Sequence, residues 1–218
     1  MNTRISGIGM TSQRTRMRMV ERLRAQGIKD ETVLGAMLEV PRHLFVDEAL
    51  SSRAYDDVSL PINFNQTISQ PYIVARMTEI LRAAGPLNRV LEIGTGCGYQ
   101  SAILAQVAGE VYTIERIKPL YDRARKQLAE LKIRNVTLRY GDGNEGWPDA
   151  APFDGIIITA AAPALSLSLR EQLAPGGRML LPVGTQDQWL YLIERDVQGF
   201  RESKLEPVKF VPLLMGKA

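Results

Sequence analysis

The segment LEIGTGCGYQ, residues 91–100, places three glycines and the only cysteine of the chain directly after an apolar run. Because glycine has no side chain, Gly94, Gly96 and Gly98 allow backbone amides to approach a ligand closely. An apolar strand, a glycine turn and a following helix are typical of open α/β sheets, which bind nucleotide-like cofactors beyond the carboxyl ends of their strands. The segment therefore predicts a cofactor site.

Acidic residues near this loop indicate the kind of cofactor. The glycine spacing differs by one residue from the G-x-G-x-x-G fingerprint, which directs a helix amino end at a pyrophosphate. Glu92 adds a carboxylate beside the loop, and its charge is expected to repel phosphates and to favour an ammonium or sulfonium ion. Glu115 ends the next strand, where its two oxygens can accept from the ribose hydroxyls of NAD or of S-adenosylmethionine.

A third acid, Asp142, ends a further predicted strand in the segment GDG. It can accept a hydrogen bond from an adenine amino group, or it can cap a turn, because Asp beside Gly is a common turn signal. Together, LEIGTGCGY, IE and GDG resemble the motifs of class I S-adenosylmethionine-dependent methyltransferases. The resemblance implies these cofactor-binding residues: Glu92, Gly94, Thr95, Gly96, Gly98, Tyr99, Glu115, Arg116, Asp142 and Gly143.

The segment before the glycine loop indicates the methyl acceptor. LPINFNQTISQPYIVARMTEIL, residues 60–81, resembles the signature of the protein-L-isoaspartate (D-aspartate) O-methyltransferases, which repair isomerised aspartyl and deamidated asparaginyl residues in damaged proteins. The resemblance extends over most of the chain through LRAQGI, VPRHLFVDEA, ERI and FVPL. It implies that Ser69, the serine of QTISQP, is the catalytic residue, acting on an isoaspartyl carboxylate.

The same resemblance implies further contacts to the two ligands. These are cofactor contacts from Gln66, Thr67 and Ile68, and substrate contacts from Thr67, Ser69, Val211 and Pro212. The last two belong to FVPLL, residues 210–214, which matches the closing segment of the family. Backbone groups of that segment are expected to pair with an extended peptide as a strand would.

One departure from the family pattern lies just before QTIS. The family usually has glycine, any residue and glycine there, whereas this chain reads Asn63, Phe64 and Asn65. Asparagine adopts a positive φ more readily than most residues, so the turn is expected to survive. Side chains now stand where the family has none, and substrate access or loop closure is expected to differ.

Methyl transfer to an isoaspartyl residue needs no general base. The α-carboxylate has a pKa near the chain-terminal value of about 3.5 and is ionised at neutral pH. The enzyme must orient a carboxylate oxygen behind an activated methyl group and exclude water, and such orientation can contribute several kcal/mol. Ser69 is therefore expected to orient the carboxylate through its hydroxyl, since no G-x-S-x-G elbow marks it as a nucleophile.

The sole histidine and the sole cysteine are predicted to be structural. His43 lacks the partners that a metal site or a catalytic triad requires, so a surface or capping role is expected. Cys97 lies near a helix amino end, but methylation of a carboxylate has no use for a thiolate, and a packing role is expected. The sequence contains no metal-ligand cluster.

Composition favours a cytoplasmic protein that binds neither membranes nor nucleic acid, and we expect it to be a monomer. The chain has 218 residues, 45% of them hydrophobic, with no disulfide framework, no leader pattern and no run of the roughly 20 apolar residues that span a bilayer. Five arginines between residues 14 and 24 supply much of the net charge of +3. They alternate with Met17, Met19, Val20 and Leu23, which predicts a helix with an apolar stripe and a solvated basic face.

The pattern of elements changes near residue 85. Residues 1–84 are predicted to form a helical element with the active-site loop, in which residues 1–10 are mobile and one helix is capped by Asp30. Residues 85–218 alternate strands and helices, which predicts a mostly parallel sheet with helices on both faces and antiparallel edge strands, including one at 208–214. The resemblance identifies this core as a Rossmann-like three-layer sandwich that binds S-adenosylmethionine and packs with the first part as one globular unit.

Two alternative functions remain open at this point. A nucleic-acid methyltransferase of the same fold would suit the basic charge, but the D/N-P-P-Y/F/W segment used on exocyclic amines is absent after the fourth strand, at residues 159–163. A specialised relative would bind the cofactor but methylate isoaspartyl residues weakly, because of the side chains of Asn63 to Asn65.

Overall fold

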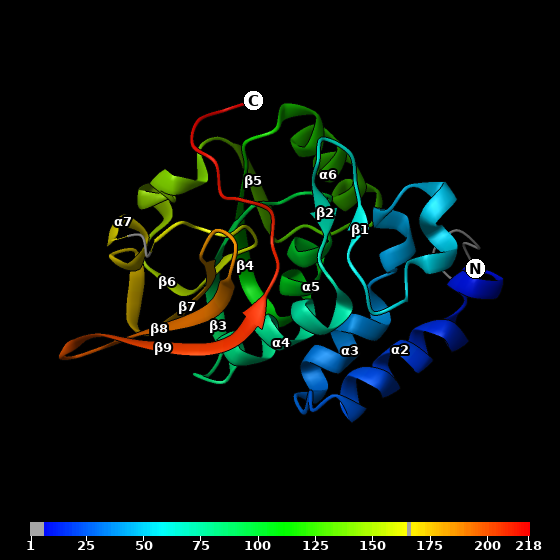
Figure 1. The fold of residues 1–218 in the computed structure, drawn as a ribbon, viewed down its shortest axis with the longest axis horizontal. Coiled ribbons are helices and arrows are strands. Elements are labelled where there is room, and N and C mark those ends of the chain that lie inside the picture. Colours follow the sequence, from blue (N-terminus) through cyan, green and yellow to red (C-terminus); the bar gives the residue numbers. More distant parts are fainter. Residues whose placement is uncertain (1–6, 165–166) are drawn as a thin grey trace.

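Seven strands form one sheet in the computed structural model, which describes residues 7–164 and 167–218. Their order is β5-β4-β3-β6-β7-β8-β9 (Figure 1). The first five in this order pair in parallel, whereas β8 and β9 are antiparallel. The strand bounds are β3 (Leu87–Ile93), β4 (Ala108–Glu115), β5 (Val136–Tyr140), β6 (Phe153–Ile158), β7 (Leu173–Val183), β8 (Gln188–Asp196) and β9 (Gly199–Val208).

Helices cover both faces of this sheet. Their bounds are α2 (Gln13–Ala25), α3 (Glu31–Glu39), α4 (Pro71–Arg82), α5 (Tyr99–Val107), α6 (Lys118–Glu130) and α7 (Leu167–Arg170). Neighbouring side chains of β3 point to opposite faces, so Val90 belongs to one hydrophobic cluster with Leu81 of α4, while Leu91 belongs to another with Leu169 of α7. The predicted three-layer α/β sandwich with antiparallel edge strands is confirmed.

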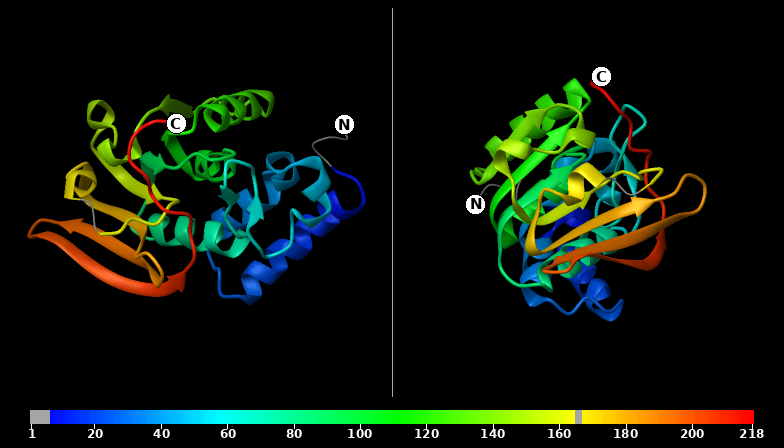
Figure 2. Two further views of the ribbon diagram at one scale, coloured as in Figure 1. Left: turned by 45° about the horizontal axis from the view of Figure 1, so that its top comes forward. Right: turned by 90° about the vertical axis from the view of Figure 1, so that its left-hand side faces the viewer.

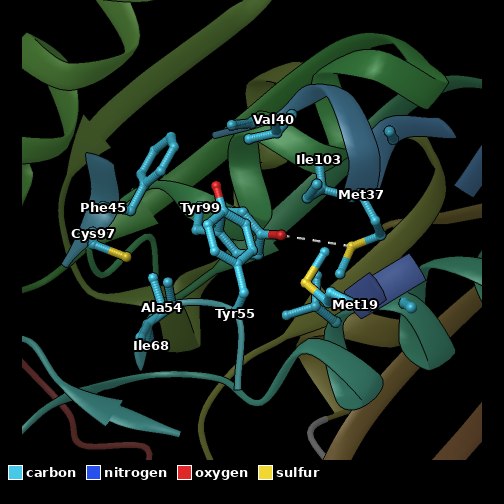
Figure 3. Packing of buried hydrophobic residues seen from close by; sticks show 14 of the residues in the cluster. Met19, Met37, Val40, Phe45, Ala54, Tyr55, Ile68, Cys97, Tyr99 and Ile103 are labelled. Carbon is cyan, nitrogen blue, oxygen red and sulfur yellow. Dashed lines mark hydrogen bonds between the residues drawn. The ribbon is translucent and has the colours of Figure 1, made fainter. Parts of the chain in front are cut away.

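The N-terminal helices α2 and α3 lie at one end of the molecule, opposite the β8 and β9 hairpin, as Figure 2 shows, and α3 packs against α5. One hydrophobic cluster joins the two parts and includes Met37 of α3 and Ile103 of α5 (Figure 3). Asp30 caps α3 as predicted, since its side chain accepts from the amide of Thr32 at 2.9 Å. The helical part therefore shares a core with α5. No helix in the described ranges is long and apolar enough to cross a bilayer.

A short hairpin precedes α4 where the sequence indicated only a loop. Its strands β1 (Leu60–Pro61) and β2 (Thr67–Ile68) pair antiparallel. The hairpin rises between the N-terminal helices and the C-terminal segment (Figure 1). It carries the QTIS segment to the carboxyl ends of the sheet.

The prediction of a strand over residues 208–214 is wrong. The last strand, β9, ends at Val208, and beyond it the chain forms only an isolated bridge between Ala161 and Pro212. Pro212 lacks an amide hydrogen and so cannot donate to a ladder. β9 itself was not predicted, because an edge strand with one face in water lacks a clear apolar signal.

Three predictions about the N-terminal part also need correction. Met17, expected in the apolar stripe, is 50% exposed, whereas Arg16 is only 5% exposed. His43 is buried, not a surface residue, and its Nδ1 lies 2.7 Å from the hydroxyl of Tyr55. Long amphipathic side chains can bury their stems and still find polar partners, which hydrophobic periodicity does not capture.

Part of the N-terminal end that was predicted to be mobile is ordered. Gly9–Thr11 forms a 3₁₀ turn before α2, and residues 1–6 lie outside the described residues. The amide of Ile8 donates to the side chain of Thr11 at 3.0 Å, which fixes this turn.

Candidate active site

The glycine loop between β3 and α5 passes over the carboxyl end of β4. The amide of Gly94 donates to the Ile114 carbonyl at 2.9 Å, and Gly94, Gly96 and Gly98 have φ values of 95°, 56° and 87°. A Cβ on Gly94 would lie 2.4 Å from Oγ1 of Thr159. The loop therefore needs glycine for its backbone conformation and, at Gly94, for space. Gly98 directly precedes α5 as its N-cap.

Glu115, the last residue of β4, ties this loop to the sheet. Its Oε2 accepts from the Gly96 amide at 2.8 Å, and its Oε1 accepts from the Ile117 amide at 2.8 Å. Burial raises the pKa of this carboxyl group, and the backbone hydrogen bonds act in the opposite direction. Each oxygen keeps a second lone pair, so the carboxylate can also accept from ribose hydroxyls.

A cavity, here called the cofactor cavity, opens beyond the carboxyl ends of β3, β4 and β6. About 610 Å³ there is free of protein atoms, a volume that includes the open mouth of the cavity. The predicted site residues that line it are Gln66, Thr67, Gly94, Gly96, Glu115, Arg116, Gly143, Val211 and Pro212. Residues that the sequence did not assign to the cofactor complete the lining: Ile93, Ile114, Ile117, Thr159, Ala160, Leu213 and Leu214. The first five adjoin predicted strand ends, and Leu213 and Leu214 belong to the FVPLL segment that was expected to bind the peptide.

Glu92 lies behind the glycine loop and does not line the cofactor cavity. Its Oε2 accepts from Ser101 and, at 2.7 Å, from Thr113, whose hydroxyl also lies 2.6 Å from that of Thr95. Burial raises the pKa of Glu92 to about 8, so the group is mainly protonated at neutral pH. The argument that its charge selects a sulfonium ion therefore fails. Glu92 instead supports the loop through the hydroxyl groups of Thr113 and Thr95.

Asp142 adopts the turn-capping alternative. Its Oδ1 accepts from the Asn144 amide at 2.9 Å, and its Oδ2 accepts from the Gly216 amide at 2.6 Å. Burial works against ionisation, but these hydrogen bonds hold the pKa of Asp142 below its ordinary value. The side chain thus joins the turn after β5 to the C-terminal segment instead of lining the cavity, which its neighbour Gly143 does.

Cys97 and Tyr99 face the N-terminal helices. Both are buried, and the hydroxyl of Tyr99 lies 3.7 Å from the sulfur of Met37 (Figure 3). Cys97 belongs to the buried hydrophobic cluster, in agreement with its predicted packing role, and burial raises the pKa of its thiol to about 11. Within the described residues, no group of His, Cys, Asp and Glu is arranged to hold a metal ion.

A second cavity, here called the acceptor cavity, adjoins the first. It is lined by Ser59, Thr67, Ser69, Gln70, Ile73, Thr159, Pro207, Val208, Lys209, Phe210 and Val211. Thr67, Thr159 and Val211 line both cavities, so the two meet at these side chains. With Thr67 and Ser69, Ile68 and Thr95 line a smaller cavity directly beside the glycine loop.

The hairpin turn keeps its form without glycine. Asn63, Phe64 and Asn65 have φ values of 76°, 53° and 55°. The Asn63 side chain donates to Oδ2 of Asp47 at 3.3 Å, and Asp47 pairs with Arg123 of α6 at 3.1 Å. These contacts anchor the hairpin tip to the N-terminal part and to α6, which a glycine at position 63 could not do.

The C-terminal segment runs across the carboxyl ends of the sheet (Figure 1). The Val211 carbonyl accepts from the Ala161 amide at 2.8 Å, and the Leu213 amide donates to the Ala161 carbonyl at 2.8 Å. Farther along, Nε of Arg116 donates to the Gly216 carbonyl at 3.0 Å. The segment therefore closes one side of both cavities and is held there by backbone and side-chain hydrogen bonds.

Comparison with known proteins gives one consistent family. The family described as Protein-L-isoaspartate(D-aspartate) O-methyltransferase matches residues 14–218. A protein-L-isoaspartate O-methyltransferase of Methylobacillus flagellatus is 64% identical over 216 residues, which cover 97% of each chain. Another, of Nitrosomonas eutropha, is 59% identical over 218 residues, which cover 99% of this chain and 98% of the relative.

Two solved structures share the fold over nearly the whole chain. A protein-L-isoaspartate O-methyltransferase superposes with a TM-score of 0.84 at 26% identity, covering 92% of this chain and 67% of the other. A Plasmodium falciparum structure described as an enzyme of this type, in complex with S-adenosyl-L-homocysteine, gives a TM-score of 0.79 at 26% identity and covers 91% of this chain and 98% of the other.

Proposed function

This chain belongs to the protein-L-isoaspartate (D-aspartate) O-methyltransferase family, and from that premise we propose that it methylates the α-carboxylate of L-isoaspartyl residues in damaged proteins and peptides. S-adenosylmethionine is the methyl donor and S-adenosylhomocysteine the product. The family description extends the acceptor class to D-aspartyl residues. One observation carries the proposal: the cavity that contains Ser69 meets the cavity that contains Glu115 at Thr67 and Thr159.

The cofactor cavity suits an adenosyl ligand. When bound, S-adenosylmethionine supplies an electrophilic methyl group on its sulfonium centre. Gly94 and Gly96 line the cavity without side chains, and Glu115 offers its free lone pairs to the ribose. The Gly143 backbone and apolar residues such as Ile114 and Leu214 would enclose the remainder, which keeps water away.

The acceptor cavity has to orient an anion, since an isoaspartyl carboxylate is ionised at neutral pH. Hydroxyl groups of Ser69 and Thr67 are available there as hydrogen-bond donors. Ser69 is only half-buried, so a peptide can reach it from solvent. In this proposal Ser69 holds one carboxylate oxygen while the other faces the junction of the cavities, and no residue has to remove a proton.

The C-terminal segment offers an edge for the peptide backbone. Val211 and Leu213 direct backbone groups toward Ala161. Because polar groups alternate along an extended chain, the Pro212 carbonyl points to the opposite edge, where a substrate amide can donate to it. Pairing through the backbone suits an enzyme that must accept many sequences.

Three further properties belong to the same proposal. The protein acts on proteins and not on nucleic acid, because residues 159–163 lack the segment used on exocyclic amines. It works in the cytoplasm, as its single cysteine favours a reducing compartment. It works as a monomer, since one chain supplies the lining of both cavities.

The direct test is methyl transfer from methyl-labelled S-adenosylmethionine to an isoaspartyl peptide. Its aspartyl twin and an RNA serve as controls. We expect base-labile label on the isoaspartyl peptide alone. Label on the RNA would favour a nucleic-acid methyltransferase, and cofactor binding without transfer would favour the specialised relative.

A further inference from the structure

Arg42 connects the N-terminal part to the active-site segment from a completely buried position. It opens a 3₁₀ turn, Arg42–Phe45, and its side chain has 0% exposure. Its Nε donates to the Ala54 carbonyl at 2.8 Å, and its Nη2 donates to the Ser69 carbonyl at 2.8 Å. A single guanidinium thus fixes the backbone of the residue that the proposed function places on the substrate carboxylate.

The same guanidinium also contacts the end of the glycine loop. Its central carbon lies 4.8 Å from the centroid of the Tyr99 ring, a cation–π arrangement. Tyr99 is the first residue of α5 and follows the loop that lines the cofactor cavity. Arg42 therefore touches both segments whose relative placement determines the distance between the methyl donor and the acceptor.

The positive charge of Arg42 has no negative partner within the described part of the chain. No ion pair joins it to an acidic side chain, and its Nη1 has no hydrogen-bond acceptor. Burial lowers its pKa, and the neighbouring Tyr99 works against that change. Arginine nevertheless remains protonated in proteins. A buried charge without a counter-ion is costly, and so its presence beside Ser69 requires an explanation.

We propose that Arg42 is a positioning residue whose counter-charge arrives with the substrate. This inference rests on the proposed function. The isoaspartyl α-carboxylate, held by the Ser69 hydroxyl, lies just beyond the peptide group that Arg42 binds, where a low dielectric strengthens the attraction. Arg42 acts through that peptide group and through its charge, and it does not take part in bond making.

A pair of peptides separates this role from a structural one. One carries the isoaspartyl α-carboxylate, and the other carries a neutral α-carboxamide of the same shape. Dissociation constants of both are measured on enzyme saturated with S-adenosylhomocysteine, so no reaction occurs. The readout is their ratio, because damage to the fold weakens both peptides equally and leaves the ratio unchanged.

We expect wild-type enzyme to prefer the carboxylate and Arg42→Met to lower that preference about tenfold or more. Arg42→Lys keeps the charge and retains most of the preference. Arg16→Met is the matched control, because Arg16 is also a buried arginine of the N-terminal part, with 5% exposure, and donates to the Glu39 carbonyl at 3.5 Å. We expect its loss to leave the ratio of the two dissociation constants unchanged. If Arg42→Met does not fold, the same measurement is made on Arg42→Gln, whose side chain keeps a hydrogen-bond donor but carries no charge.

An unchanged ratio in the neutral variants would overturn the inference. An equal drop in Arg16→Met would do the same, because the effect would then belong to any buried arginine of this part. A wild-type enzyme that neither binds nor methylates the isoaspartyl peptide would instead reject the proposed function, so the two failures are distinguishable.

Discussion

The hydroxyl of Thr159 donates to the carbonyl of Gly94 at 2.6 Å and fills the space that a side chain on Gly94 would need. This contact joins the end of β6 to the glycine loop at the junction of the two cavities. It links the shape of the cofactor cavity to a residue of the acceptor cavity. The sites for the methyl donor and the methyl acceptor therefore share Thr159 in their linings.

Gly94→Ala tests this relationship. The new Cβ would lie 2.4 Å from Thr159 Oγ1 at a φ of 95°, and overpacking of this kind costs about 1–3 kcal/mol. We expect affinity for S-adenosylhomocysteine, measured by calorimetry, to fall about ten- to a hundredfold. Thr159→Ala in the same chain should restore part of it.

Gly176→Ala is the control for the backbone effect alone. Gly176 has a φ of 80°, and a Cβ there meets nothing within 4 Å. We expect it to leave cofactor affinity unchanged. Similar losses in both alanine variants would show that the space beside Thr159 is unimportant.

The hairpin turn should become more stable when Phe64 is replaced by glycine. Phe64 has a φ of 53° and is 52% exposed, so the change relieves backbone strain and sacrifices little burial. We expect Phe64→Gly to raise the free energy of unfolding, measured in urea, by about 0.5–1 kcal/mol. Asn63→Gly should raise the free energy of unfolding less, because asparagine tolerates this conformation and the contact to Asp47 is lost. A decrease for Phe64→Gly would contradict the strain argument.

Much of the fold was predictable because its signals are local. Asp30 at the start of α3, Pro71 at the start of α4 and the glycines after β3 each act within a few residues of the element they begin or end. The sheet then followed from the alternation of apolar strands with helices.

Side-chain roles that depend on distant partners were not predictable. Glu92 looked like a charge beside the loop, but burial in the folded chain raises its pKa, although the hydrogen bond from Thr113 of another strand acts in the opposite direction. Arg42 had no role assigned from the sequence, because only the folded chain brings Ser69 to it. Sequence spacing identifies residues at a strand end, but it does not show which way each one points.

The protonation of Glu92 predicts a pH dependence of stability. Its pKa is about 8 in the folded protein against an ordinary 4.5, so between these values the folded state binds more protons than the unfolded state. The free energy of unfolding should therefore fall as pH rises from about 5 to 8. Glu92→Gln should flatten this fall in urea titrations, while Glu171→Gln, at an exposed position, should not. An unchanged slope in Glu92→Gln would show that Glu92 ionises normally.

Asp142 should affect the cofactor through the C-terminal segment. Asp142→Ala removes the acceptor of the Gly216 amide, so the segment that lines the cofactor cavity loses one of its side-chain anchors, while those from Arg116 and Tyr140 remain. We expect faster amide hydrogen exchange over residues 213–218 and several-fold weaker binding of S-adenosylhomocysteine. Asp149→Ala, at an exposed position nearby, should change neither. Weaker binding without faster exchange would indicate a direct contact to the cofactor instead.

The central claim is that Ser69 serves the acceptor and Glu115 serves the cofactor. Glu115→Gln removes charge from the ribose site and should weaken binding of S-adenosylhomocysteine about tenfold or more. Ser69→Ala should leave that binding unchanged, since Ser69 does not line the cofactor cavity.

The most direct test is kcat/KM of Ser69→Ala for an isoaspartyl peptide at saturating S-adenosylmethionine, measured beside wild type. The account predicts a fall of about ten- to a hundredfold, because the hydroxyl that orients the carboxylate is gone. A kcat/KM equal to that of wild type would contradict it.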